Sequence, residues 1–207
     1  MPIPSTNFPA TMLLLEIDLH CKTIIRTAEW LNESAEHWTA LSQGIDDGKT
    51  MPPIAIVAQC TACLSSAASI RRLLFIAERR GKRLPVIEKR CAALMDILGS
   101  PTIPVICSVA VRNSWEHLDE RLDDLLSTRA FKSYADIHVA AEPPAVGTIA
   151  LRRFDLVRME IRYGPTEAIA LEPLVQEARK LASLIAKAWT RLETETCIVY
   201  SMGATIE

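Results

Sequence analysis

Residues 105–126, VICSVAVRNSWEHLDERLDDLL, are the stretch around which we expect the fold to be arranged. The segment opens with apolar residues and continues with closely spaced charged ones. This pattern is typical of a helix with one buried and one polar face. Its charged part also contains an arginine and a histidine at a spacing that acid–base chemistry can use. We therefore expect a central helix that begins near Pro104 and carries the functional residues.

Upstream of this stretch, apolar residues recur at helical spacing in three further segments. These segments are residues 11–42, 52–80 and 85–98. The first should bury Leu14, Ile17, Cys21, Ile24, Ile25, Ala28, Leu31, Ala35, Trp38 and Leu41, with a break near Asn32 left open. Prolines open the second segment and Gly81 closes it, as is usual at helix ends. We predict a mainly α protein in which residues 1–128 form an antiparallel four-helix bundle core.

Residues 129–207 show a different pattern. Apolar and charged residues alternate over 157–163, which predicts a half-buried strand. Gly164 and Pro165 supply a turn before a return strand at 167–171, and weaker strand candidates lie at 136–140 and 148–151. A final amphipathic helix is expected at 174–192, followed by a tail that is a short strand or loose. We predict a small α+β extension, an appended β-hairpin and C-terminal helix, packed on the bundle.

Composition narrows the class of protein. The 207 residues carry a net charge of −2, which argues against coating nucleic acid through bulk charge. The first residues lack the basic region of a signal peptide, and their short apolar run is followed at once by Glu16 and Asp18, so we do not expect a signal peptide. The most apolar segment, 54–70, is interrupted by polar residues and is expected to be too short to span a membrane. The six cysteines lack the spacing of a disulfide scaffold. We expect a cytoplasmic protein without a membrane partner, in which Cys60 and Cys63 are buried small side chains.

Arg112, Asn113 and His117 are the candidate catalytic residues. An arginine fork can hold a phosphate through two hydrogen bonds, and an imidazole can take or give a proton near neutral pH. Together they suit RNA cleavage, in which the 2′-hydroxyl attacks the neighbouring phosphate. The alternative is a solvated helix face on which His117 pairs with Glu120 or Arg121.

The segment Arg112-Asn113-x-x-x-His117, on a helix of a helical core, resembles the motif of the HEPN superfamily. The resemblance covers this helix and the helical core, and nothing beyond about Ser127. It implies a metal-independent endoribonuclease that acts as a homodimer, as in toxins and defence proteins, or a related module that only binds. It also implies that Arg112 holds the phosphate, Asn113 orients the site and His117 transfers the proton. The motif usually lies near the end of a HEPN domain, whereas an α/β segment follows here.

Four neighbours are further binding candidates: Trp115, Glu116, Glu120 and Arg121. Trp115 is the one tryptophan that we consider for stacking on a base. The acidic residues would repel phosphate. Together with Glu16 and His20 they could instead be considered as ligands of a metal ion. The Glu-x-x-His pairs of carboxylate-bridged metal bundles do not occur in the sequence, so we predict neither a metal nor a cofactor.

Two basic segments allow an RNA contact or a purely structural role. The run from Arg71 to Arg90 either follows a phosphate backbone or complements the dipole of the helix it ends. The arginines of the predicted hairpin, 152, 153, 158 and 162, are equally ambiguous. The sequence thus favours a HEPN-like endoribonuclease or RNA- or nucleotide-binding protein. The alternative is a non-catalytic helical scaffold that binds a protein partner.

Overall fold

A computed structural model describes residues 8–46, 48–76, 84–108, 110–117, 120, 122–123, 127 and 133–203. Most of these residues are helical, and the rest include a four-stranded mixed sheet. The helices are α1 (Phe8–Ser42), α2 (Pro53–Leu74), α3 (Leu84–Leu98), α4 (Pro104–Cys107), α5 (Ala110–Glu116) and α7 (Leu171–Gly203). The strands are β1 (Ser133–Ala140), β2 (Thr148–Asp155), β3 (Glu160–Tyr163) and β4 (Glu167–Ala170). The prediction of a mainly α protein is confirmed.

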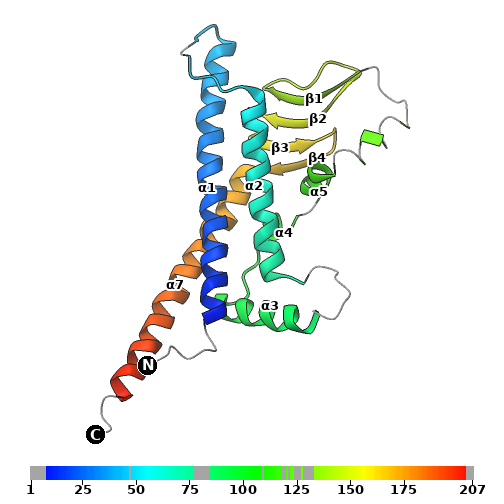
Figure 1. Cartoon of the computed structure of the whole chain (residues 1–207). Helices are drawn as coiled ribbons and strands as arrows, with labels where there is room; N and C mark the ends of the chain where they lie inside the picture. The colour runs from blue at the N-terminus through cyan, green and yellow to red at the C-terminus, as the bar shows by residue number, and fades with distance from the viewer. Residues whose placement is uncertain are drawn as a thin grey trace.

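The long helix α1 packs against both α2 and α7 (Figure 1). The N-terminus of α1 and the C-terminus of α7 lie at the same end of the molecule, so these two helices run in opposite directions. The sheet lies on the side of α2 that faces away from α1, and α3 lies across the lower ends of α1 and α2 as drawn. The C-terminal helix, which the sequence predicted as an appendage, is therefore part of the helical core.

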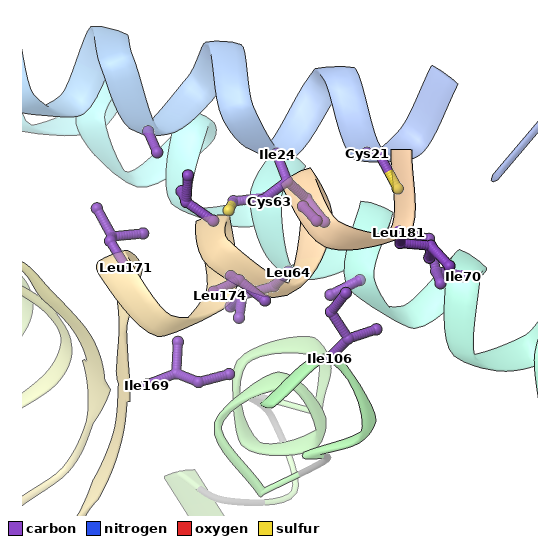
Figure 2. Packing of buried hydrophobic residues seen from close by; sticks show 14 of the residues in the cluster. Cys21, Ile24, Cys63, Leu64, Ile70, Ile106, Ile169, Leu171, Leu174 and Leu181 are labelled. Atoms are coloured by element: carbon purple, nitrogen blue, oxygen red, sulfur yellow. The ribbon is translucent and has the colours of Figure 1, made fainter. Parts of the chain in front are cut away.

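Helical spacing explains why α1 and α7 pack together. The predicted α1 face is buried at Leu14, Ile17, Cys21, Ile24, Ala28, Leu31 and Ala35. On α7, Leu174, Ala178, Leu181, Ile185 and Ala188 are buried at the same spacing. Figure 2 shows Cys21 and Ile24 of α1 close to the Leu174–Leu181 stretch of α7. Burying one leucine or isoleucine contributes about 2 kcal/mol, so these two stripes hold the helices together.

The structure answers one question that the sequence left open and differs from two of the sequence predictions. Helix α1 is continuous through Asn32, where a break was an open alternative. Helix α7 begins at Leu171 and continues to Gly203, so the tail is helical from residue 196 to residue 203 rather than a strand. Near the C-terminal end of α1, Leu41 was predicted to be buried but is 37% exposed. Helical periodicity thus predicted the buried faces well and the helix ends poorly.

The predicted central helix is broken. Helix α4 ends at Cys107, and the backbone of Ser108 is extended (φ −61°, ψ 131°) before α5 begins at Ala110. The β-branched residues Val105, Ile106 and Val111 disfavour a continuous helix because their side chains crowd the preceding turn. The break allows α5 to leave the path of α4 and pack against β3 and β4.

Glu177 of α7 holds α4 in place. Its two carboxylate oxygens accept the backbone N–H groups of Val105 (3.0 Å) and Ile106 (2.8 Å). These amides lie in the first turn of α4, where a helix has no internal acceptors for them. The N-cap residue, Ile103, supplies no side-chain hydrogen bond, so Glu177 takes over the role of the cap.

Replacing Glu177 by alanine is expected to lower the free energy of unfolding by about 3 kcal/mol, because two hydrogen bonds to a charged acceptor are lost. Glu177→Gln keeps one acceptor oxygen and should lose roughly half as much. Urea unfolding checks both values, with Lys187→Ala, an exposed position on the same helix, as the control. Equal stability of Glu177→Ala and the control would contradict this account of α4.

The sheet has the strand order β1-β2-β3-β4. Strands β1 and β2 are parallel, whereas β2 pairs with β3, and β3 with β4, in antiparallel fashion. The predicted hairpin is present as β3 and β4, and the two weaker strand candidates complete the sheet. Phe154 of β2 lies opposite Ile161 of β3, and both are fully buried in the main core.

One hydrophobic cluster runs through both predicted parts of the chain. It includes Leu14 and Ile70 from the helical half, and Phe154 and Leu181 from beyond residue 128. The predicted boundary at residue 128 stays a prediction. The expectation that residues 54–70 are too short and too polar to span a membrane is wrong for the helix as it forms. Among the described residues, α2 alone is long and apolar enough to cross a membrane, and half of its apolar window is buried inside the protein. Core helices of soluble proteins have the same character.

Candidate functional site

Helix α5 is anchored by one buried side. Val111 is 1% exposed, Ser114 is 0% exposed and Trp115 is 5% exposed, at the i, i+3, i+4 spacing of a helix face. The helix packs against β3, β4 and α2. Arg112 and Asn113 lie on the partly exposed side. The core therefore fixes the orientation of a short helix that would not be stable alone.

Asn113 positions the side chain of Arg112. The Nε and Nη2 groups of Arg112 donate hydrogen bonds to Oδ1 of Asn113, at 3.2 and 2.5 Å. These bonds restrict the rotamer of a long, flexible side chain, which lowers the entropy that the arginine would lose on holding a phosphate.

His117 follows the last residue of α5. Its backbone N–H donates to the carbonyl of Asn113 (2.9 Å), so the helical hydrogen bonding reaches it, and its side chain is 56% exposed. The Nδ1 atom lies 3.8 Å from Oε1 of Glu120. This distance is too long for a hydrogen bond but short enough for an ion pair when the imidazole is charged. The pairing expected for a solvated helix face is thus present beside the candidate catalytic residue.

Trp115 does not present its ring to solvent. Its indole N–H donates to Oγ1 of Thr61 on α2 (2.9 Å), and Thr61 in turn donates to the carbonyl of Val57 (2.8 Å). With 5% of its surface exposed, the ring has no free face on which a base could stack. We assign to Trp115 the attachment of α5 to α2.

The remaining binding candidates are only partly described. Glu116 is the last residue of α5, and its side chain lies outside the described part of the structure. Arg121 lies outside the described residues. The side chain of Glu120 is 75% exposed. Of the predicted set, the structure therefore brings together Arg112 with Asn113 and His117 with Glu120.

The basic segments mostly make structural contacts where they are described. Arg90 of α3 donates to the carbonyl of Arg72 at the end of α2 (2.8 Å), which favours the capping role over a phosphate track. Three sheet arginines pair with carboxylates: Arg152 with Asp136, Arg153 with Asp155 and Arg162 with Glu160. These pairs neutralise most of the positive edge that the sequence suggested.

Buried thiols lie at the centre of the helical core. Cys60 and Cys63 are both 0% exposed, which confirms their prediction as buried small side chains. Burial raises the pKa of the Cys63 thiol to about 12, and burial, with a smaller effect of Asp18, raises the pKa of Cys21 to about 12. Burial also raises the pKa of Cys60, to which Cys63 adds. Thiols held neutral in this way are poor nucleophiles and poor metal ligands.

Stability should fall at alkaline pH. In the unfolded chain these thiols ionise near their ordinary pKa, so their contribution to stability is present below about pH 8.5 and is lost as the pH rises toward 12. The loss is about 1 kcal/mol per thiol and pH unit. Urea unfolding at pH 8 and pH 10 measures it. The double variant Cys60→Ala/Cys63→Ala should show a decline at least about 2 kcal/mol smaller than the wild type, and an equal decline would contradict the assignment.

The metal interpretation gains little from the geometry. Glu16 and His20 face each other on α1, with Nε2 of the histidine 3.3 Å from the carboxylate. Within the described part of the chain, no group of three or more His, Cys, Asp or Glu side chains is placed to hold a metal ion, at this pair or elsewhere.

A pocket of about 170 Å³, which the sequence did not predict, lies between α1 and α7. Its walls contain Glu29, Asn32, Met159, Glu172 and Arg179, with apolar residues beneath them. On α1, Glu29 and Asn32 flank the predicted buried face at helical spacing. That spacing alone looks like any solvated helix edge, so the sequence carried no signal for this site.

The chain matches no protein-family model, and comparisons with curated proteins and with solved structures return no match.

Proposed function

We propose that the protein is a metal-independent endoribonuclease of the HEPN type, with Arg112, Asn113 and His117 as its catalytic group. The observation that carries the proposal is the contact between Arg112 and Asn113 on a helix whose other side is fixed in the core. The arrangement supports a preset guanidinium on α5 and an exposed histidine just after its end, the two kinds of group that cleavage by an internal 2′-hydroxyl needs.

His117 would remove the proton from the 2′-hydroxyl or protonate the leaving 5′-oxygen. Arg112 would stabilise the negative charge on the phosphorus centre. The two side chains lie five residues apart, an offset of about 140° on an ideal helix. One copy of α5 therefore does not bring them onto one face. We propose that two copies of the chain supply the groups of a shared site, which also agrees with the dimers of HEPN proteins. The cytoplasm is the compartment in which we place this activity.

The acidic neighbour Glu120 opposes phosphate binding by charge repulsion. Its carboxylate lies 3.8 Å from Nδ1 of His117, within the distance of an ion pair with the protonated imidazole that proton transfer would form. Glu120 thus fits a role in holding that imidazole in place.

Arginine variants test the proposal. Incubation of a mixed set of end-labelled RNAs with wild type should give cleavage products. Arg112→Ala should lower the rate by at least about a hundredfold, and Arg112→Lys should restore little, since lysine lacks the planar fork. The matched control is Arg26→Ala, which removes an exposed arginine of α1. Equal rates for Arg112→Ala and Arg26→Ala would remove Arg112 from the mechanism.

A second candidate function is a non-catalytic scaffold that binds a protein partner. It is favoured by exposed apolar side chains along the first half of α1, where Met12 is 53%, Leu15 is 48% and Leu19 is 57% exposed. Their spacing of three and four residues places them on one face, which is typical of a helix that packs against another helix. Absence of RNA cleavage by folded protein would favour this function.

A further inference from the structure

The pocket between α1 and α7 has the form of a small-molecule site. One wall is formed by Ile25, Ala28, Glu29 and Asn32 of α1, at the i, i+3, i+4, i+7 positions of one helix face. The opposite wall is formed by Leu171, Glu172, Val175 and Arg179 of α7. Met159, from the turn before β3, closes one side. This pocket is separate from α5 and does not depend on the proposed RNA cleavage.

The floor of the pocket is apolar. Ala28, Leu171 and Val175 are each less than 5% exposed, and they belong to the main hydrophobic cluster. The volume of about 170 Å³ slightly exceeds that of an engineered cavity of about 150 Å³ that accepts benzene. The pocket therefore has room for an apolar body of about six to eight non-hydrogen atoms.

The rim of the pocket is polar and carries an excess of negative charge. Glu29 and Glu172 supply two carboxylates and Asn32 supplies an amide, against one guanidinium from Arg179. Glu172 and Arg179 are seven residues apart on α7, a distance of about 10 Å along the helix axis. Because α1 and α7 run in opposite directions (Figure 1), Asn32, toward the C-terminal end of α1, lies nearer to Glu172 than to Arg179. Asn32 and Glu172 therefore lie toward one end of the pocket and Arg179 toward the other, with Glu29 between them, less than one helical turn from Asn32.

The carboxylates already make weak contacts with polar groups. Glu29 lies 3.7 Å from the guanidinium of Arg26, and both side chains are substantially exposed. Glu172 accepts a hydrogen bond from the amide of Gln176 (2.9 Å). Exposed pairs of this kind contribute little stability. An ammonium group that enters above the apolar floor can therefore displace them at small cost.

The backbone of Met159 is held in place at one side of the pocket. Its backbone φ is +50°, in the left-handed region that costs a non-glycine residue about 1 kcal/mol. The turn is held by Asp155, whose carboxylate accepts the N–H groups of Val157 and Arg158, and by the bond from Leu171 N–H to the Met159 carbonyl (2.9 Å). Glycine would adopt this conformation without strain, but it would leave the pocket without its flexible apolar side chain.

We propose that this pocket binds a small organic ammonium ion with an apolar body. The body fills the space between Ala28, Val175 and Met159. The ammonium group donates to the carboxylates of Glu29 and Glu172 and to the side-chain oxygen of Asn32. Burial of the apolar body supplies most of the affinity, and the two carboxylates select the cation over a neutral molecule of the same shape.

Titration with benzylamine tests the proposal, with benzyl alcohol as the neutral match. Binding is followed calorimetrically and through the NMR signal of the Met159 methyl group. Benzylamine should bind at least about ten times more tightly than benzyl alcohol and should shift the Met159 signal. The double variant Glu29→Gln/Glu172→Gln should weaken benzylamine binding about tenfold and leave benzyl alcohol unchanged.

Two controls separate the site from general effects. Glu36→Gln removes an exposed carboxylate of α1 outside the pocket and should leave the affinity for benzylamine unchanged. Met159→Gly should weaken the binding of both compounds without unfolding the protein. Equal affinity for the two compounds, or an unchanged Met159 signal at millimolar benzylamine, overturns the proposal. RNA cleavage should be the same in all these variants, so failure here and failure of the proposed nuclease activity are distinguishable.

Discussion

Replacing His117 by alanine is expected to lower the rate of RNA cleavage by a factor of about 10² to 10⁴, the usual contribution of a general acid or base. The side chain is 56% exposed and follows the last residue of α5, so its removal leaves the core intact. The free energy of unfolding should therefore change by less than about 0.5 kcal/mol. Loss of activity without loss of stability is the signature of a catalytic group.

His20→Ala is the matched control for this experiment. His20 also lies beside a glutamate on a helix, with Nε2 3.3 Å from Glu16, and its replacement removes the same chemical group from a different surface. Rates are compared by gel analysis of a labelled RNA at several pH values between 5 and 8. If His117→Ala and His20→Ala cleave RNA at the same rate, His117 has no part in the chemistry.

Replacing Trp115 by alanine is expected to lower the free energy of unfolding by about 3 to 5 kcal/mol, which is typical of a buried tryptophan. The ring is 5% exposed, and its N–H bond to Thr61 joins α5 to α2. Because the orientation of α5 depends on this anchor, cleavage activity should fall together with stability. Urea unfolding and RNA cleavage, measured on the same preparation, test both effects.

Trp115→Phe separates packing from the hydrogen bond. Phenylalanine keeps most of the buried area and loses the indole N–H, so the loss of stability should be nearer 1 kcal/mol. Activity should then remain close to that of the wild type. If instead both variants are fully stable but fail to bind RNA, Trp115 acts by stacking on a base and its assignment to the core is wrong.

The helical core could be predicted from the sequence because its signal is local. Leu14, Ile17, Ile24 and Leu31 recur at helical spacing, and the structure buries all four. The position of α7 could not be predicted in this way. Its apolar stripe shows that one face must be covered, but the partner, α1, is more than a hundred residues away in the sequence. Periodicity identifies a buried face without identifying what covers it.

Two features of the fold, the break between α4 and α5 and the pairing of β1 with β2, could not be predicted from local sequence patterns. The segment from Val105 to Val111 is apolar enough for a helix, yet its β-branched residues and the cap from Glu177 favour a short helix and a break. The hairpin of β3 and β4 was predicted as such, and strands were also predicted at 136–140 and 148–151, but their pairing with the hairpin was not. Strand β1 pairs with β2 in parallel, and such a pair leaves no signature in the turn between them.

The candidate site was predictable only as a set of residues. Arg112, Asn113 and His117 are neighbours in the sequence, and the contact between the first two follows from that proximity. Trp115 was grouped with them for the same reason, but the burial of α5 turns its ring inward. The α1–α7 pocket was missed because residues 25–32 and 171–179 meet only in the folded chain.

The most direct test of the central claim is the chemistry of the RNA ends. RNA is incubated with wild type and with His117→Ala in excess EDTA, and the products are analysed by mass spectrometry. Attack by the 2′-hydroxyl predicts products that end in a 2′,3′-cyclic phosphate, from the wild type only. Products with 3′-hydroxyl ends that appear only when a divalent cation is restored, or no cleavage of any RNA by the folded protein, would contradict the assignment of Arg112 and His117 to catalysis.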